Sequence, residues 1–146
     1  MIKLSTGLRQ ALAISGSLKA TLDGGLVQIY SGAIPASADA ALGSAVLLNE
    51  ISVGGDGTPV TFEAAAPGGI LVKNVAETWV GTNAADGTPT FFRYVKDGDA
   101  GDASASAVRF QGTAGPLGSD MFIATLPLVN GQPLSFELFQ LAIPEQ

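Results

Sequence analysis

The hydrophobic pattern of this chain changes near residue 24. Before it, leucine recurs at every fourth position in two runs, Leu4-Leu8-Leu12 and Leu18-Leu22, which predicts helix. Ser15-Gly16-Ser17 is expected to divide the region into two short helices, and Asp23-Gly24-Gly25 is expected to end it. A leucine stripe of this kind either docks on the core of its own domain or forms an arm that reaches a neighbouring subunit.

After residue 24 the apolar residues come in short runs that are cut by Gly and Pro. The runs predict strands at residues 26–32, 44–53, 61–66, 70–75, 76–82, 89–98, 106–113, 121–129 and 133–143. Residues 34–43 predict a loop or a single helical turn. Asn130-Gly131 is a strong turn signal, and it predicts a hairpin between the last two strands.

Turn signals at roughly ten-residue intervals are typical of an all-β sandwich or jelly roll. We therefore predict an all-β, β-sandwich or jelly-roll-like fold of about eight or nine short strands with a short N-terminal helical segment. We expect an N-terminal helical arm at residues 1–23 and a β-sandwich domain at residues 24–146. The length of 146 residues fits one such domain.

Composition narrows the possible functions. The chain has no Cys or His, and only 14% of its residues are charged. The common nucleophile–base pairs and the usual zinc ligands are therefore missing. We assign no catalytic, cofactor-binding or metal-binding residues, and we expect the chain not to be an enzyme. The missing Cys fits a reducing compartment, or an assembly that is stabilised by burial between chains.

Charge and hydropathy indicate which partners to expect. The net charge is -6, and the seven basic residues form no cluster, so we expect no direct binding to nucleic acid. No apolar run approaches the ~20 residues that cross a bilayer, and no secretion signal is evident. We therefore expect synthesis in the cytoplasm and no membrane association.

Two groups of residues suggest chemistry, and each has a simpler structural interpretation. Asp97, Asp99 and Asp102 lie in one loop, which is either an exposed turn or a Ca²⁺ site that lacks the closing Glu. Glu77 lies beside Trp79, as in a sugar site, but the sequence does not establish the second carboxylate that glycoside hydrolysis requires. Core packing is the simpler interpretation of Trp79. The other strand carboxylates are expected to face solvent: Glu50 and Glu63.

Four motifs carry a resemblance to a known family. They are Ile29-Tyr30-Ser31-Gly32, Pro35-Ala36-Ser37-Ala38-Asp39, Trp79-Val80-Gly81-Thr82-Asn83-Ala84-Ala85 and Phe91-Phe92-Arg93. Together with the N-terminal leucine segment, they resemble a family of small tailed-bacteriophage virion structural proteins over roughly residues 5–112. The resemblance implies a virion structural role and brings no catalytic residues.

The resemblance makes a capsid decoration (cement) protein the leading hypothesis. Such a protein would lie on the capsid surface of the virion, bind the major capsid protein, and associate with itself as a dimer or trimer. A tail, baseplate or fibre-associated component is the alternative within virions. A carbohydrate-binding module is a further alternative, and it requires Trp79, Tyr30 and Tyr94 to be exposed on one surface.

Overall fold

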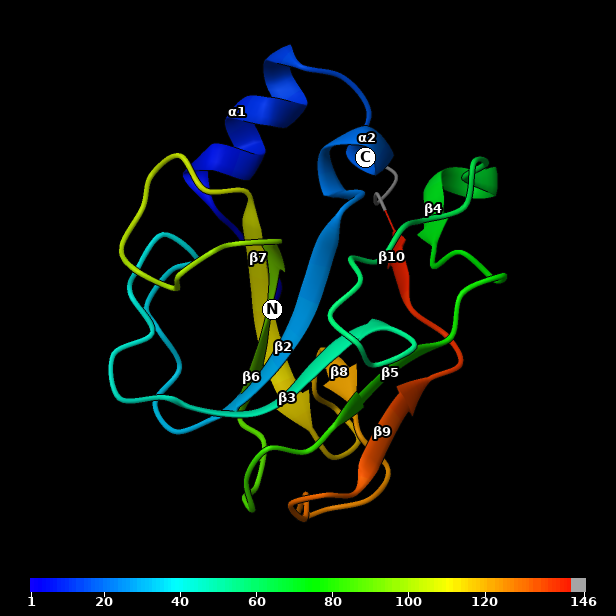
Figure 1. The fold of residues 1–146 in the computed structure, drawn as a ribbon. Coiled ribbons are helices and arrows are strands. Elements are labelled where there is room, and N and C mark those ends of the chain that lie inside the picture. The colour runs from blue at the N-terminus through cyan, green and yellow to red at the C-terminus, as the bar shows by residue number, and fades with distance from the viewer. Residues whose placement is uncertain (143–146) are drawn as a thin grey trace.

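The computed structural model describes residues 1–142, and these form a mainly antiparallel β structure (Figure 1). Helices α1 (Thr6–Ile14) and α2 (Leu18–Leu22) lie near the N-terminus, and a short 3₁₀ turn, η1, spans Pro67–Gly69. The strands are β1 (Lys3–Leu4), β2 (Gly25–Ser31), β3 (Val46–Val53), β4 (Ile70–Val72), β5 (Trp79–Thr82), β6 (Phe91–Lys96), β7 (Arg109–Gly115), β8 (Met121–Phe122), β9 (Pro133–Phe136) and β10 (Gln140–Ala142).

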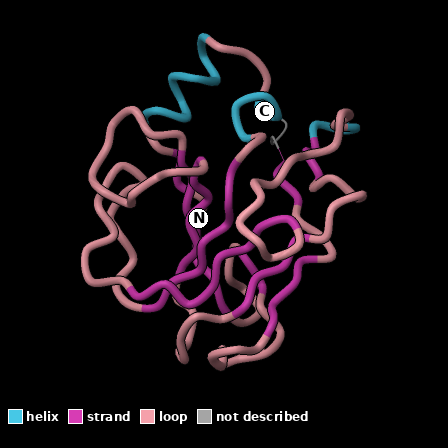
Figure 2. Tube along the Cα trace, viewed as in Figure 1, coloured by secondary structure: helices cyan, strands magenta, loops and turns pink. Residues whose placement is uncertain are grey.

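Eight of these strands form one sheet in the order β1-β7-β6-β2-β3-β5-β9, with β8 joined in parallel to β7. The other pairs in this sheet are antiparallel. Strands β10 and β4 form a separate two-stranded sheet. Figure 2 shows that long loops connect the strands and that helix is confined to the N-terminal region and one short turn.

The core lies between the large sheet, the two helices and the small sheet. Trp79 belongs to this core and contacts Phe62 edge-to-face, with ring centroids 5.4 Å apart. Phe139 lies 5.4 Å from the same indole and brings the C-terminal segment onto the core. Leu71 of the small sheet belongs to the same buried cluster. The two sheets therefore enclose one core, and the predicted all-β, sandwich-like fold with a short N-terminal helical segment is confirmed.

The N-terminal leucines dock on this core. Leu8 and Leu22 are fully buried within it. Ser5 caps α1 by accepting a hydrogen bond from the Leu8 amide at 3.0 Å, and the predicted break between the helices occurs at Gly16, whose φ is 128°. Leu4 is not helical, because Lys3–Leu4 pairs with β7 instead. Of the two interpretations of the stripe, docking within the chain is the one that the structure shows.

The C-terminal hairpin prediction is wrong. A turn does form at residues 129–132, but β9 pairs with β5, whereas β8 pairs with β7. The reason lies in the backbone of Asn83, which accepts a hydrogen bond from the Gly131 amide and donates one to Gln132. These bonds direct the chain toward β5. The predicted strand at 133–143 is interrupted between β9 and β10, and its last residue lies outside the described residues.

The predicted strand at residues 61–66 is also wrong. This segment forms no ladder, and its one isolated β-bridge pairs Phe62 with Lys73. Its donors are used elsewhere: the Phe62 amide donates to Asp23 and the Thr61 amide donates to Glu77. The predicted strands at 44–53, 70–75, 76–82 and 89–98 contain β3, β4, β5 and β6, and those at 26–32 and 106–113 overlap β2 and β7. The strand predicted at 121–129 is too long, because only β8 at its first two residues forms.

Truncation of a helix leucine tests whether α1 is part of the core. Leu8→Ala should lower the free energy of unfolding by about 2–5 kcal/mol, because it leaves a cavity in the core. Leu4→Ala, at a half-exposed position, should lower it by less than about 1 kcal/mol. Urea unfolding of both variants measures the difference. Equal stability of the two variants would contradict docking of the helix.

Candidate functional site

The large sheet has one face on the apolar core, and the opposite face is called the second face here. A row of polar side chains crosses this second face, which is nevertheless largely buried. The strand register aligns Glu50, Gln28, Arg93 and Gln111 across β3, β2, β6 and β7. Gln28 donates to Glu50 at 2.7 Å, and Arg93 donates to the Gln111 side-chain oxygen at 2.7 and 3.2 Å. Glu50 is thus half-buried and hydrogen-bonded, which corrects the expectation that it faces solvent.

The loop at residues 32–45 covers this face because strand side chains donate to its carbonyl oxygens. The donors are Gln111 to Pro35, Lys3 to Ala36, Arg93 to Ser37 and Ala40, and Arg109 to Ala38. A buried carbonyl without a partner is costly, so these bonds make burial of an irregular loop possible. The loop contains bends and turns but no regular helix.

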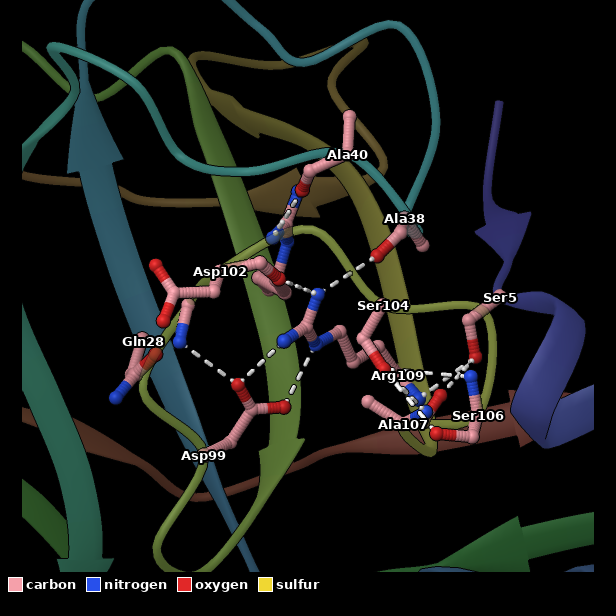
Figure 3. A network of polar contacts seen from close by, with 12 residues as sticks. Ser5, Gln28, Ala38, Ala40, Asp99, Asp102, Ser104, Ser106, Ala107 and Arg109 are labelled. Atoms are coloured by element: carbon pink, nitrogen blue, oxygen red, sulfur yellow. Dashed lines mark hydrogen bonds and ion pairs between the residues drawn. The ribbon is translucent and has the colours of Figure 1, made fainter.

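A second loop, residues 97–108 between β6 and β7, also covers this face and is bound by Arg109. It contains the three aspartates that the sequence analysis singled out. The Arg109 guanidinium forms a two-pronged ion pair with Asp99, with both N–O distances at 2.6 Å, and it also donates to the Asp102 carbonyl at 2.8 Å (Figure 3). Burial acts to raise the pKa of Asp99, but the hydrogen bonds from Arg109 and Gly101 and the nearby positive charge hold it below its usual value.

Of the two interpretations of this loop, the structure therefore does not support the Ca²⁺ site. Both Asp99 oxygens are bound by Arg109, while Asp97 and Asp102 are exposed. No group of three or more His, Cys, Asp or Glu within residues 1–142 is placed to hold a metal ion. The aspartates do not act as a group, because Asp99 alone is directed inward as the counter-ion of a buried arginine.

Ser5 and Asp39 connect the N-terminal helix to the same network. The Ser5 hydroxyl accepts from the Arg109 amide at 2.9 Å and donates to the Ala107 carbonyl at 2.7 Å (Figure 3). Asp39 accepts from the Thr6 hydroxyl at 2.6 Å and the Thr6 amide at 2.7 Å, and these bonds lower the pKa of its carboxyl. One polar layer therefore joins α1, both loops and the sheet.

The aromatic residues of the carbohydrate-binding hypothesis are buried. Trp79 is 1% exposed and its indole nitrogen donates to Glu77 at 2.8 Å. Tyr30 stacks on Phe91, with ring centroids 5.1 Å apart, and burial raises its pKa to about 12. Tyr94 is fully buried and donates to the Leu22 carbonyl. None of the three can present a flat ring to a sugar, so this alternative is not supported.

An apolar groove with a volume of about 830 Å³ lies where the helices, β1, β8 and the C-terminal strands meet. Its lining is almost entirely aliphatic and aromatic. At its rim, Phe122 is 57% and Leu138 is 63% exposed. Contiguous exposed apolar surface of this kind marks interaction sites in soluble proteins. The groove is the candidate functional site.

Sequence reasoning did not identify the groove. Ile2, Phe122 and Leu138 come from three distant segments, and nothing in the sequence pattern shows that they share a surface. The alternation of side chains along a strand gave a partial indication that Phe122 and Leu138 are exposed. Each lies next to a buried residue, Met121 or Phe139, and therefore points away from the core.

Comparisons of the chain with protein-family models, with curated proteins and with solved structures found no match. Within residues 1–142, every helix is too short or too polar to cross a membrane.

Removal of the Asp99 charge tests the importance of the buried ion pair. Asp99→Asn should lower the free energy of unfolding by about 3–5 kcal/mol at pH 7, because Arg109 would remain buried without its counter-ion. Asp97→Asn, in the same loop but exposed, should change it by less than about 0.5 kcal/mol.

The same pair of variants predicts a pH dependence. Because the folded-state pKa of Asp99 is lowered, its stabilisation is present above the unfolded-state pKa of about 4 and is lost as the pH falls through the folded value. The stability difference between the wild type and Asp99→Asn should therefore narrow below about pH 4. A difference that is independent of pH between 2 and 7, measured by urea unfolding, would contradict this role.

Proposed function

We propose that this protein is a bacteriophage virion structural protein that decorates the capsid surface, with the major capsid protein as its partner and self-association into a dimer or trimer. The exposed apolar groove is the observation that carries the proposal. Monomeric soluble proteins rarely expose large apolar side chains next to one another, yet Phe122 and Leu138 are both more than half exposed at the same groove. Contact with a partner would remove this surface from water.

The location of the family-like motifs supports the proposal. Ser37 and Asp39 in the loop motif bond to Arg93 and Thr6, and Arg93 itself belongs to another motif. Asn83, in the third motif, is bonded to Asn49 at 2.7 Å. In this chain the motif residues hold loops in place, and none of these contacts forms a catalytic arrangement. Residues that fix a scaffold are what a structural protein requires.

A decorating role also fits the energetics of a repeating lattice. Many copies bind equivalent sites on a shell, so each contact can be modest, and self-association multiplies the effect. The net charge of -6 disfavours adhesion to packaged nucleic acid. We also propose that the chain has no enzymatic activity, because without His and Cys it lacks the common nucleophile–base pairs.

The groove provides the experiment. Phe122→Asp and Leu138→Asp should each weaken binding to purified capsids by at least about tenfold, because a carboxylate would have to lose its water at the contact. Leu117→Asp is the matched control: it adds the same charge at a residue that is 88% exposed and does not line the groove. Its binding should equal that of the wild type.

Cosedimentation with capsids measures the binding, and circular dichroism confirms that each variant is folded. Equal binding by all three variants would contradict a role for the groove. Binding of the wild type to tails instead of capsids would contradict decoration and favour the tail component.

A further inference from the structure

A second, smaller cavity of about 330 Å³ lies between the segment at 73–79 and β9. Unlike the groove, it is lined mainly by polar and charged side chains, and the two cavities share Phe136 as a wall. Its lining is Lys73, Val75, Glu77, Thr78, Trp79, Ser135, Phe136 and Glu137.

Lys73 is the unusual residue of this cavity, because its charge is buried and has no counter-ion among residues 1–142. The residue is 6% exposed. Its ammonium donates to the Glu77 carbonyl at 2.7 Å and the Asn74 carbonyl at 3.3 Å, and it lies 5.7 Å from the centre of the Trp79 ring. Among residues 1–142, no carboxylate lies within 4 Å of this nitrogen.

Two glutamates line the cavity, but neither is paired with Lys73. The Glu77 carboxylate is directed toward Thr61 and Trp79, and it accepts bonds from the Thr61 amide at 3.0 Å, the Thr61 hydroxyl at 2.5 Å and the indole at 2.8 Å. Glu137 is exposed at the rim and makes no ion pair with Lys73. A buried ammonium has three donors, and the two carbonyls use only two of them.

We propose that this cavity binds a carboxylate group, with Lys73 as its charged anchor. Burial of an unpaired charge costs free energy, and a bound carboxylate would remove much of that cost. Ser135 and Thr78 line the same cavity and offer hydroxyl donors for the second carboxylate oxygen. The volume is at the lower end for ligand sites, so the ligand is a small acid or a single acidic side chain. The proposal does not rest on the proposed function.

Titration of the ¹⁵N-labelled protein with sodium acetate at constant ionic strength tests the proposal, and sodium chloride is the reference. Acetate should produce saturable shifts of the amides at 73–79 and 135–137, with a Kd of about 1–10 mM. Lys73→Met should weaken binding by at least about tenfold. Lys19→Met is the matched control, because Lys19 is paired with Asp23 on the surface, and it should bind acetate like the wild type.

A second probe distinguishes a free small acid from an acidic side chain of a protein, and a second variant covers the case in which Lys73→Met does not fold. Aspartate blocked at both ends stands in for a protein side chain. Binding of both probes supports a site that accepts a partner's acidic residue, whereas binding of acetate alone supports a free small acid. If Lys73→Met does not fold, Lys73→Gln keeps a polar tip without the charge. Shifts that are linear with acetate, equal in chloride, or retained in the Lys73 variants would overturn the proposal.

Discussion

Two buried arginines are the constraint on which much of the structure depends. Arg93 and Arg109 project from neighbouring strands onto the second face of the sheet, where two irregular loops cover them. The loops can be buried there only because the guanidinium groups and Gln111 satisfy their carbonyl oxygens. Asp99 in turn balances the charge of Arg109. Loss of this layer would expose the loops and leave polar backbone groups without partners.

The two faces of the sheet therefore have different roles. The first face packs on an apolar core around Trp79, and the second supports the polar layer. Hydrogen bonds hold the loops in one conformation on the second face. The shape of the surface that the folded chain presents to a partner is therefore fixed. The groove lies beside the core, and its exposed rim at Phe122 and Leu138 supplies apolar contact area. A fixed scaffold with one apolar docking surface is the physical basis of the proposed role.

The sequence predicted the strands that alternate strongly and the two short helices, because local periodicity and turn residues specify them. It did not predict the burial of Arg93. Alternation assigns polar residues to solvent, and only the tertiary position of the loop at 32–45 shows that both faces are covered. The hairpin at Asn130-Gly131 failed for a related reason: backbone bonds from Asn83 decide which strand β9 joins. The groove could not be predicted, because its lining comes from distant segments.

The central claim is that this protein belongs on the outside of a phage head. Immunogold labelling of intact virions with an antibody against this chain tests the claim most directly. The account predicts label spread over the head surface. Label confined to the tail would contradict it. So would virions without label, provided that the antibody recognises the purified protein.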